Sequence, residues 1–127
     1  MKFRSTLVGL TIVSACMSLP TVQGQKNTVT KVVVAPPKIP LGPCPATVEF
    51  VGTIFVSRPA RVDYRWERSD GATGPRESVD IRSAAKSVTN SWRVGTPRKP
   101  FSGWQRLRVL APNGVVSNTA PLQIKCS

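Results

Sequence analysis

The chain has 127 residues and carries 18 Lys and Arg against 6 Asp and Glu, which gives a formal net charge of +12. It contains no histidine, so nucleophile activation and general-base catalysis by imidazole are excluded, as is the commonest metal ligand. The excess of positive charge favours polyanionic partners: nucleic acid, anionic lipid headgroups, acidic cell-wall polymers or polysaccharides. The alternative is that the charge only keeps the protein in solution.

Residues 1–24 have the pattern of a secretory signal peptide. Lys2 and Arg4 make the start positive, an apolar run covers residues 7–19, and small or branched residues precede an expected cleavage point after Gly24. A membrane-spanning helix needs about 20 apolar residues, so this run predicts no permanent transmembrane helix. Cleavage leaves 103 residues with a net charge of +10, which suits one domain of a secreted or periplasmic protein.

Lipid anchoring is the alternative outcome of export. Residues 13–16 resemble the lipobox of bacterial lipoproteins, in which the cysteine is lipidated and becomes the first residue. Leucine is usual where Val13 stands, so plain secretion is the preferred expectation. Lipidation of Cys16 would instead anchor the protein to a membrane.

After either processing event, Cys44 and Cys126 are the thiols that remain for pairing. An even number of cysteines in an exported chain predicts a disulfide. Cys126 also falls on the inward-facing parity of the last expected strand. Closing so long a loop would stabilise the fold by about 4 kcal/mol in the chain-entropy description.

Residues 25–43 lead into a core domain that is expected to cover residues 44–127. The β-branched content of residues 28–34 predicts a first strand. Residues 35–40 contain three prolines, which cannot donate ladder hydrogen bonds, so this stretch is expected to be extended and polyproline-like. It either runs along a sheet edge or links the domain to a tether.

From Cys44 onward apolar and polar residues alternate, which is the period of a half-buried strand. The alternation predicts about seven short strands and no helix, counting the first strand above and stretches near residues 47–57, 62–66, 79–81, 88–94, 107–109 and 120–126. Asn113-Gly114 predicts a tight turn, because this pair is favoured where the backbone needs positive φ. The strand spacing favours a β-sandwich, and a barrel of the oligonucleotide-binding type is the alternative.

Several stretches resemble bacterial exported immunoglobulin-like domains: residues 44–54 and 62–72, Gly103-Trp104, Leu107, Val109, Pro112-Asn113 and the closing Cys126. Tyr64-x-Trp66 followed by Asp70-Gly71 is also similar to PKD domains, another immunoglobulin-like sandwich. The resemblance implies an immunoglobulin-like β-sandwich that binds or spaces and has no catalytic residues. The chain departs from that pattern at its disulfide, which would join the start of the second strand to the end of the last.

The acidic residues and the one motif that resembles a catalytic sequence predict no catalytic site, and no cofactor or metal site is expected. Asp63 and Glu67 would lie about 13 Å apart on one strand face, too far for a glycosidase pair, and are interpreted as salt-bridge partners. Ser83 and Lys86 match the Ser-x-x-Lys motif of penicillin-binding enzymes, but that motif needs a helix start in a larger domain, so a turn is expected.

A basic sheet face is the best candidate site. In an immunoglobulin-like order the third, sixth and seventh strands are neighbours, and their outward residues would be Arg61, Asp63, Arg65, Glu67, Arg106, Arg108, Gln123 and Lys125. This face either binds anions or is a solvated surface balanced by its two acids. The candidate binding residues are Arg65, Arg106 and Arg108, assisted by Arg98 and Lys99 in a basic loop at residues 95–102.

Alternation along the strands predicts which aromatic residues face the core and which face outward. Tyr64 and Trp66 lie on the core parity and are expected to pack inside the domain. Trp104 lies on the parity opposite Leu107 and is expected either at the surface, as part of the binding face, or as a cap on the end of the sandwich.

The sequence therefore predicts an exported, non-enzymatic binding or structural module that acts in or outside the bacterial envelope. Its expected partner is a polyanion, such as a cell-wall polymer, polysaccharide or nucleic acid, or an envelope protein. The alternative is a small secreted enzyme or enzyme inhibitor, for which the loop at residues 95–102 would suit an inhibitor.

Overall fold

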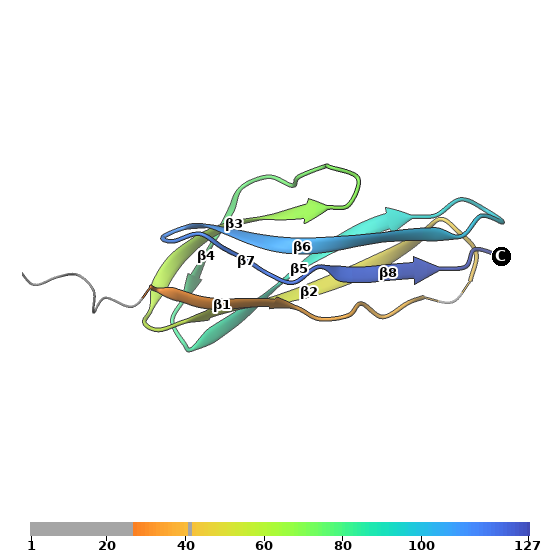
Figure 1. Cartoon of the computed structure of the whole chain (residues 1–127). Helices are drawn as coiled ribbons and strands as arrows, with labels where there is room; N and C mark the ends of the chain where they lie inside the picture. Colours follow the sequence, from red (N-terminus) through yellow and green to blue (C-terminus); the bar gives the residue numbers. More distant parts are fainter. Residues whose placement is uncertain (1–26, 41) are drawn as a thin grey trace, which may run out of the picture.

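A computed structural model describes residues 27–40 and 42–127, and these residues form strands in two antiparallel sheets arranged as a β-sandwich (Figure 1). The predicted signal peptide at residues 1–24 and Cys16 lie outside the described residues. The strands are β1 (Val29–Val34), β2 (Ala46–Val56), β3 (Ala60–Arg68), β4 (Glu77–Ile81), β5 (Ala85–Val94), β6 (Phe101–Ala111), β7 (Val115–Val116) and β8 (Ala120–Ile124).

The first sheet has the order β1-β2-β5, and the second has the order β4-β3-β6 with β7 and β8 both paired to β6. On the edge away from β3, strand β6 has two partners, because β8 pairs with its first half, from Phe101 to Gln105, and β7 pairs with Arg108 and Val109. The expectation that the third, sixth and last strands are neighbours is thus confirmed, since they are β3, β6 and β8. The two-residue strand β7 was not predicted, because so short an element has no alternation to detect.

The inward residues of both sheets form one core. Phe50, Ile54 and Leu107 are fully buried, and Tyr64 and Trp66 are buried beside them, as their parity predicts. Gly52 marks a close approach of the two sheets, because a Cβ there would lie 2.7 Å from Leu107 Cδ2 and 3.2 Å from Trp66 Cη2. The residue is therefore small so that an indole from the opposite sheet can pack against the backbone.

The predicted disulfide between Cys44 and Cys126 is present, with a Cα–Cα separation of 5.2 Å. Cys44 precedes β2 and Cys126 follows β8, so the bond joins the two sheets at one end of the sandwich. Gly95, at the end of β5, has a φ of +98° and packs against this bond. A Cβ at this position would lie 2.6 Å from one sulfur and 2.8 Å from the other. Both the positive φ and the lack of space beside the disulfide therefore favour glycine here.

Strand β1 lies at the edge of the first sheet and is held by two asparagine side chains from the other sheet's connections. Asn113 Oδ1 accepts the N–H of Val29 at 2.9 Å and Asn113 Nδ2 donates to Val29 O at 3.0 Å. Asn118 makes the same pair of bonds with Val34, at 2.9 and 3.0 Å. Each amide thus replaces the neighbouring strand that the edge lacks.

This arrangement corrects the prediction for the Asn-Gly turn. Neither Asn113 nor Gly114 has a positive φ, and the non-glycine residue with positive φ in the described chain is Arg98, at 66°. Asn113 is needed for its side chain, which reaches the backbone of Val29, rather than for its tolerance of left-handed backbone.

Two boundaries also differ from expectation. The basic loop is shorter than predicted because β6 already begins at Phe101 and pairs there with Ile124 of β8. Strand β5 is longer, because it begins at Ala85 and runs without a register shift along β2. Lys86 of the Ser-x-x-Lys sequence is therefore a strand residue.

The proline-rich residues 35–40 form no strand and run along β2, where the N–H of Ala35 donates to Val51 O at 3.0 Å. This agrees with the expected course along a sheet. Across the described residues, no helix has the length and apolar character needed to cross a membrane.

Candidate anion-binding face

The candidate site lies on the outward side of the second sheet, where β3 and β6 run side by side. The antiparallel register places Arg65 opposite Arg108 and Glu67 opposite Arg106. Residues two apart on a strand share a face, so all four side chains meet on one side of the sheet. We call Arg65, Arg106 and Arg108 the arginine trio.

Glu67 lies at the centre of the arginine trio and bonds to every member. Its Oε1 accepts from Arg106 Nε at 2.8 Å, and its Oε2 accepts from Arg108 Nε at 2.8 Å and from Arg65 Nη2 at 3.2 Å. The Glu67 side chain is only 10% exposed, whereas the three arginine side chains remain 33–38% exposed. The carboxylate is therefore covered by the guanidinium groups that it binds.

Burial alone would raise the pKa of Glu67, because it disfavours the charged form. The hydrogen bonds from Arg108 and Arg106, together with the positive charge of Arg108 and the bond from Arg65, outweigh burial and lower the pKa of Glu67 to about 2. Glu67 is thus ionised at neutral pH. One carboxylate then faces three guanidinium groups, so the cluster retains two uncompensated positive charges.

The bonds to Glu67 determine which guanidinium nitrogens remain to donate hydrogen bonds to a ligand. Arg106 and Arg108 each use Nε for the carboxylate, and among the described residues their terminal nitrogens donate no hydrogen bond to protein. Guanidinium donors in this state suit a second anion such as a carboxylate, sulfate or phosphate. Glu67 therefore orients the arginine side chains while leaving donors for a ligand.

Trp104 adjoins the arginine trio on the same side of β6. The Arg106 guanidinium lies over its indole ring, with the central carbon 5.2 Å from the ring centroid. Trp104 is half-buried and stands opposite Pro121 of β8, which is exposed. The interpretation of Trp104 as a residue of the outward face agrees with this position, whereas Tyr64, Trp66 and Trp92 are buried.

Arg98 and Lys99 are not brought to the arginine trio. They lie in the turn between β5 and β6, where Thr96 and Lys99 form an isolated bridge. The stretch of β6 from Phe101 to Arg106 alone spans about 17 Å at the rise of a strand. These two cations therefore belong to another part of the surface, near the disulfide, and do not complete the candidate site.

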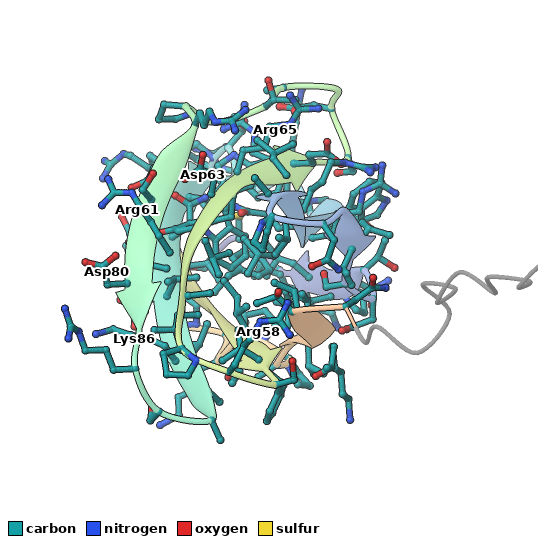
Figure 2. The ribbon with its side chains drawn as sticks, turned by 90° about the vertical axis from the view of Figure 1, so that its left-hand side faces the viewer. Arg58, Arg61, Asp63, Arg65, Asp80 and Lys86 are labelled. Atoms are coloured by element: carbon teal, nitrogen blue, oxygen red, sulfur yellow. A yellow bond between two sulfur atoms is a disulfide. The ribbon has the colours of Figure 1, made fainter. Side chains whose placement is uncertain are left out.

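The part of the predicted basic face nearest β4 is balanced by ion pairs. Asp63 accepts from Arg76 at 2.8 Å, and Arg61 pairs with Asp80 of β4 at 3.7 Å. Figure 2 shows Arg61, Asp63 and Arg65 following one another along β3, with Asp80 beside Arg61. This end of the face matches the solvated alternative. The uncompensated charge lies at the arginine trio and at Lys125, an exposed residue after β8 that forms no ion pair within the described part of the chain.

Sequence reasoning missed the burial of Glu67 and the role of Arg68. Alternation placed Glu67 on an exposed face, but the strand alternation breaks at Trp66 and Glu67, which are both buried. Arg68 binds Asp70 at 2.8 Å and lies 4.8 Å over the ring of Trp92 in the other sheet. The bond to Asp70 is local, but the contact with Trp92 joins strands that are far apart in the sequence, so no local pattern could reveal it.

Within residues 27–40 and 42–127, no three His, Cys, Asp or Glu side chains gather in a way that could hold a metal ion. The Ser83 hydroxyl donates to the backbone oxygen of Ala85 at 2.8 Å, a local bond of the connection between β4 and β5. Comparison with known proteins finds no matching family model, no matching curated protein and no matching solved structure. The function must therefore be argued from the residues themselves.

Proposed function

We propose that this protein is an exported, immunoglobulin-like module that binds anionic polymers through the arginine trio and catalyses no reaction. The observation that carries the proposal is the cluster of three guanidinium groups around one covered carboxylate. Nearby, Arg76 and Asp63 pair their charges one to one, whereas the arginine trio keeps an excess of positive charge around Glu67. Here the terminal nitrogens of Arg106 and Arg108 remain for a ligand.

The immunoglobulin-like assignment is supported by strand order. Strands β1-β2-β5 correspond to strands A, B and E of that fold, and β4-β3-β6-β8 correspond to C′, C, F and G. Export is supported by the signal-peptide pattern of residues 1–24 and by the disulfide, a bond typical of oxidising compartments. The net positive charge of the chain would draw it toward acidic polymers in or outside the bacterial envelope.

The test is binding to heparin by a variant that removes two members of the arginine trio. Arg65→Gln with Arg108→Gln leaves Arg106 paired with Glu67 Oε1, so the covered carboxylate keeps a partner. We expect the Kd for heparin at fixed low salt to rise about tenfold, on the scale of two partly exposed charge contacts. Binding by the wild type should also weaken steeply with added salt.

The matched control removes the same charge elsewhere. Arg58 and Arg82 are exposed and lie in the connections on either side of β3 and β4, and Arg58→Gln with Arg82→Gln gives the same net charge as the test variant. Figure 2 shows Arg58 well apart from Arg65. If both double variants lose heparin affinity equally, the charge acts in bulk and the arginine trio is not a binding site.

A further inference from the structure

A cleft of about 530 Å³ opens beside Trp104, at the point where β3 ends and β6 continues. It is lined by Ser69, Asp70, Trp92, residues 101–104 and Pro121. Ligand pockets commonly have volumes of about 300–1,000 Å³, so the cleft has the size for a small ring with its substituents. Trp104 lines the cleft and also carries the Arg106 guanidinium over its ring, so the cleft adjoins the arginine trio.

The floor of the cleft depends on a residue without a side chain. A Cβ on Gly103 would lie 2.9 Å from Ser69 Oγ and 3.2 Å from both Phe101 Cε1 and Trp92 Cη2. Phe101 and Trp92 pack edge to face there, with ring centroids 5.4 Å apart. Gly103 thus lets the β3–β4 connection and two aromatic rings approach the backbone of β6 and form a closely packed floor of the cleft.

The polar groups at the cleft can donate hydrogen bonds to hydroxyl groups and accept hydrogen bonds from them. Ser69 Oγ accepts the N–H of Trp104 at 3.1 Å, which leaves its own hydrogen to donate, and Ser102 is exposed at the rim. The Asp70 side chain is 49% exposed, and a backbone bond from Ala72 and the bond from Arg68 lower its pKa, so it is ionised. Both oxygens of this carboxylate already accept from Arg68, which compensates its charge, and their remaining lone pairs can accept hydrogen bonds from sugar hydroxyls.

We propose that the Trp104 cleft binds one sugar ring of an acidic polysaccharide, whose neighbouring carboxylate or sulfate is held by the arginine trio. This inference rests on the proposed function and names its ligand class. The exposed part of the Trp104 indole offers an apolar surface for the C–H face of the ring, while Asp70 and Ser69 meet its hydroxyls. Arg106 and Arg108 follow Trp104 at about 7 and 14 Å along β6. The sugar ring and the acidic groups of the neighbouring sugars would therefore bind in a row along this strand.

The experiment measures the Kd of wild type and variants for three polyanions at one salt concentration. Heparin carries charge on sugar rings, inorganic polyphosphate carries charge without rings, and poly(dT) carries charge with bases. Trp104→Ala and Trp104→Leu change no charge, and the second keeps an apolar side chain if the first destabilises the fold. We expect both to weaken heparin binding about tenfold, the scale of one lost aromatic stacking contact, and to leave polyphosphate binding unchanged.

Phe55→Ala is the matched control, because Phe55 also carries a cation over its ring, Lys31 at 5.7 Å, but lies on the other sheet. It should change binding to none of the three polymers. If Trp104 substitution weakened binding to heparin and to polyphosphate equally, Trp104 would only position Arg106. That result would overturn the sugar-binding inference and leave the proposed role of the arginine trio unaffected. A larger loss for poly(dT) than for heparin would assign the cleft to nucleobases.

The same experiment also tests the proposed function, through the affinity of the arginine-trio variant for heparin and polyphosphate. The variant Arg65→Gln with Arg108→Gln should weaken binding to heparin and to polyphosphate alike, because its contact is with charge. If that variant matches the control Arg58→Gln with Arg82→Gln on every polymer, the proposed function fails, and the sugar-binding inference that rests on it fails too.

Discussion

At the scale of single residues, Glu67 determines the electrostatics of the candidate site. It is covered by Arg65, Arg106 and Arg108, so its charge lies where water cannot screen it well. Removing one partner of such a cluster leaves the others with an uncompensated charge. Glu67 therefore serves both the stability of the sheet and the orientation of the guanidinium groups.

The low pKa of Glu67 predicts a specific pH dependence of stability. Because its pKa is about 2 in the folded protein and 4.5 ordinarily, the carboxylate stabilises the fold above pH 4.5 and this contribution is lost as the pH falls toward 2. Glu67→Gln should cost on the order of 3 kcal/mol of unfolding free energy at pH 7 and almost nothing at pH 2. Urea unfolding followed between pH 7 and 2 measures both.

Asp80→Asn is the control for this series, because Asp80 is 57% exposed and its pair with Arg61 is 3.7 Å long. Exposed pairs contribute little, so this variant should follow the wild-type curve. A Glu67→Gln variant whose stability runs parallel to the wild type across the whole pH range would contradict the role assigned to the carboxylate.

At the scale of elements, β1 shows how an edge strand is closed by side chains. Asn113 and Asn118 bond the backbone of Val29 and Val34 near the two ends of β1, and β2 pairs with its other side. An unpaired edge is a template for association with another chain, and covering it removes that hazard. The two asparagines therefore attach the first sheet to the connections of the second sheet.

Asn118→Ala should destabilise the domain by about 1–3 kcal/mol, because it leaves the N–H and C=O of Val34 without their partners. The amide of Val34 should also exchange with solvent faster than in the wild type, which NMR can follow residue by residue. Thr119→Ala next to it is the control, since Thr119 is exposed. Unchanged exchange at Val34 would mean that the Asn118 bonds do not hold β1.

At the scale of the whole molecule, the disulfide joins the two sheets across 82 residues of sequence. A domain of this size buries a modest core, so a covalent link between its layers is a substantial part of its stability. The link lies at the end that carries the C-terminus and the β5–β6 turn (Figure 1). Gly95 of that turn packs against both sulfur atoms, so a larger residue there would collide with the disulfide.

Replacing Cys44 and Cys126 together by alanine should lower the unfolding free energy by about 4 kcal/mol, because the unfolded chain then gains the entropy of an open loop of 82 residues. Urea denaturation of the variant and of the wild type, each with and without reductant, measures this. Reductant should lower the stability of the wild type to that of the variant and leave the variant unchanged. Equal stability of oxidised wild type and variant would rule out a stabilising role.

The sequence by itself determined which residues face inward, because alternation in a strand is a local property that each residue carries with its neighbours. Alternation thereby predicted the all-β class and the burial of Trp66. The disulfide was predicted mainly from the even cysteine count of an exported chain, and the adjacency of β3, β6 and β8 from an immunoglobulin-like strand order. Only the tertiary structure decided that Glu67 is covered, because three arginines from two strands must converge on it. It likewise separated Arg98 from Arg106 and gave Asn113 its contact with Val29, since such distances depend on how strands pair across the chain.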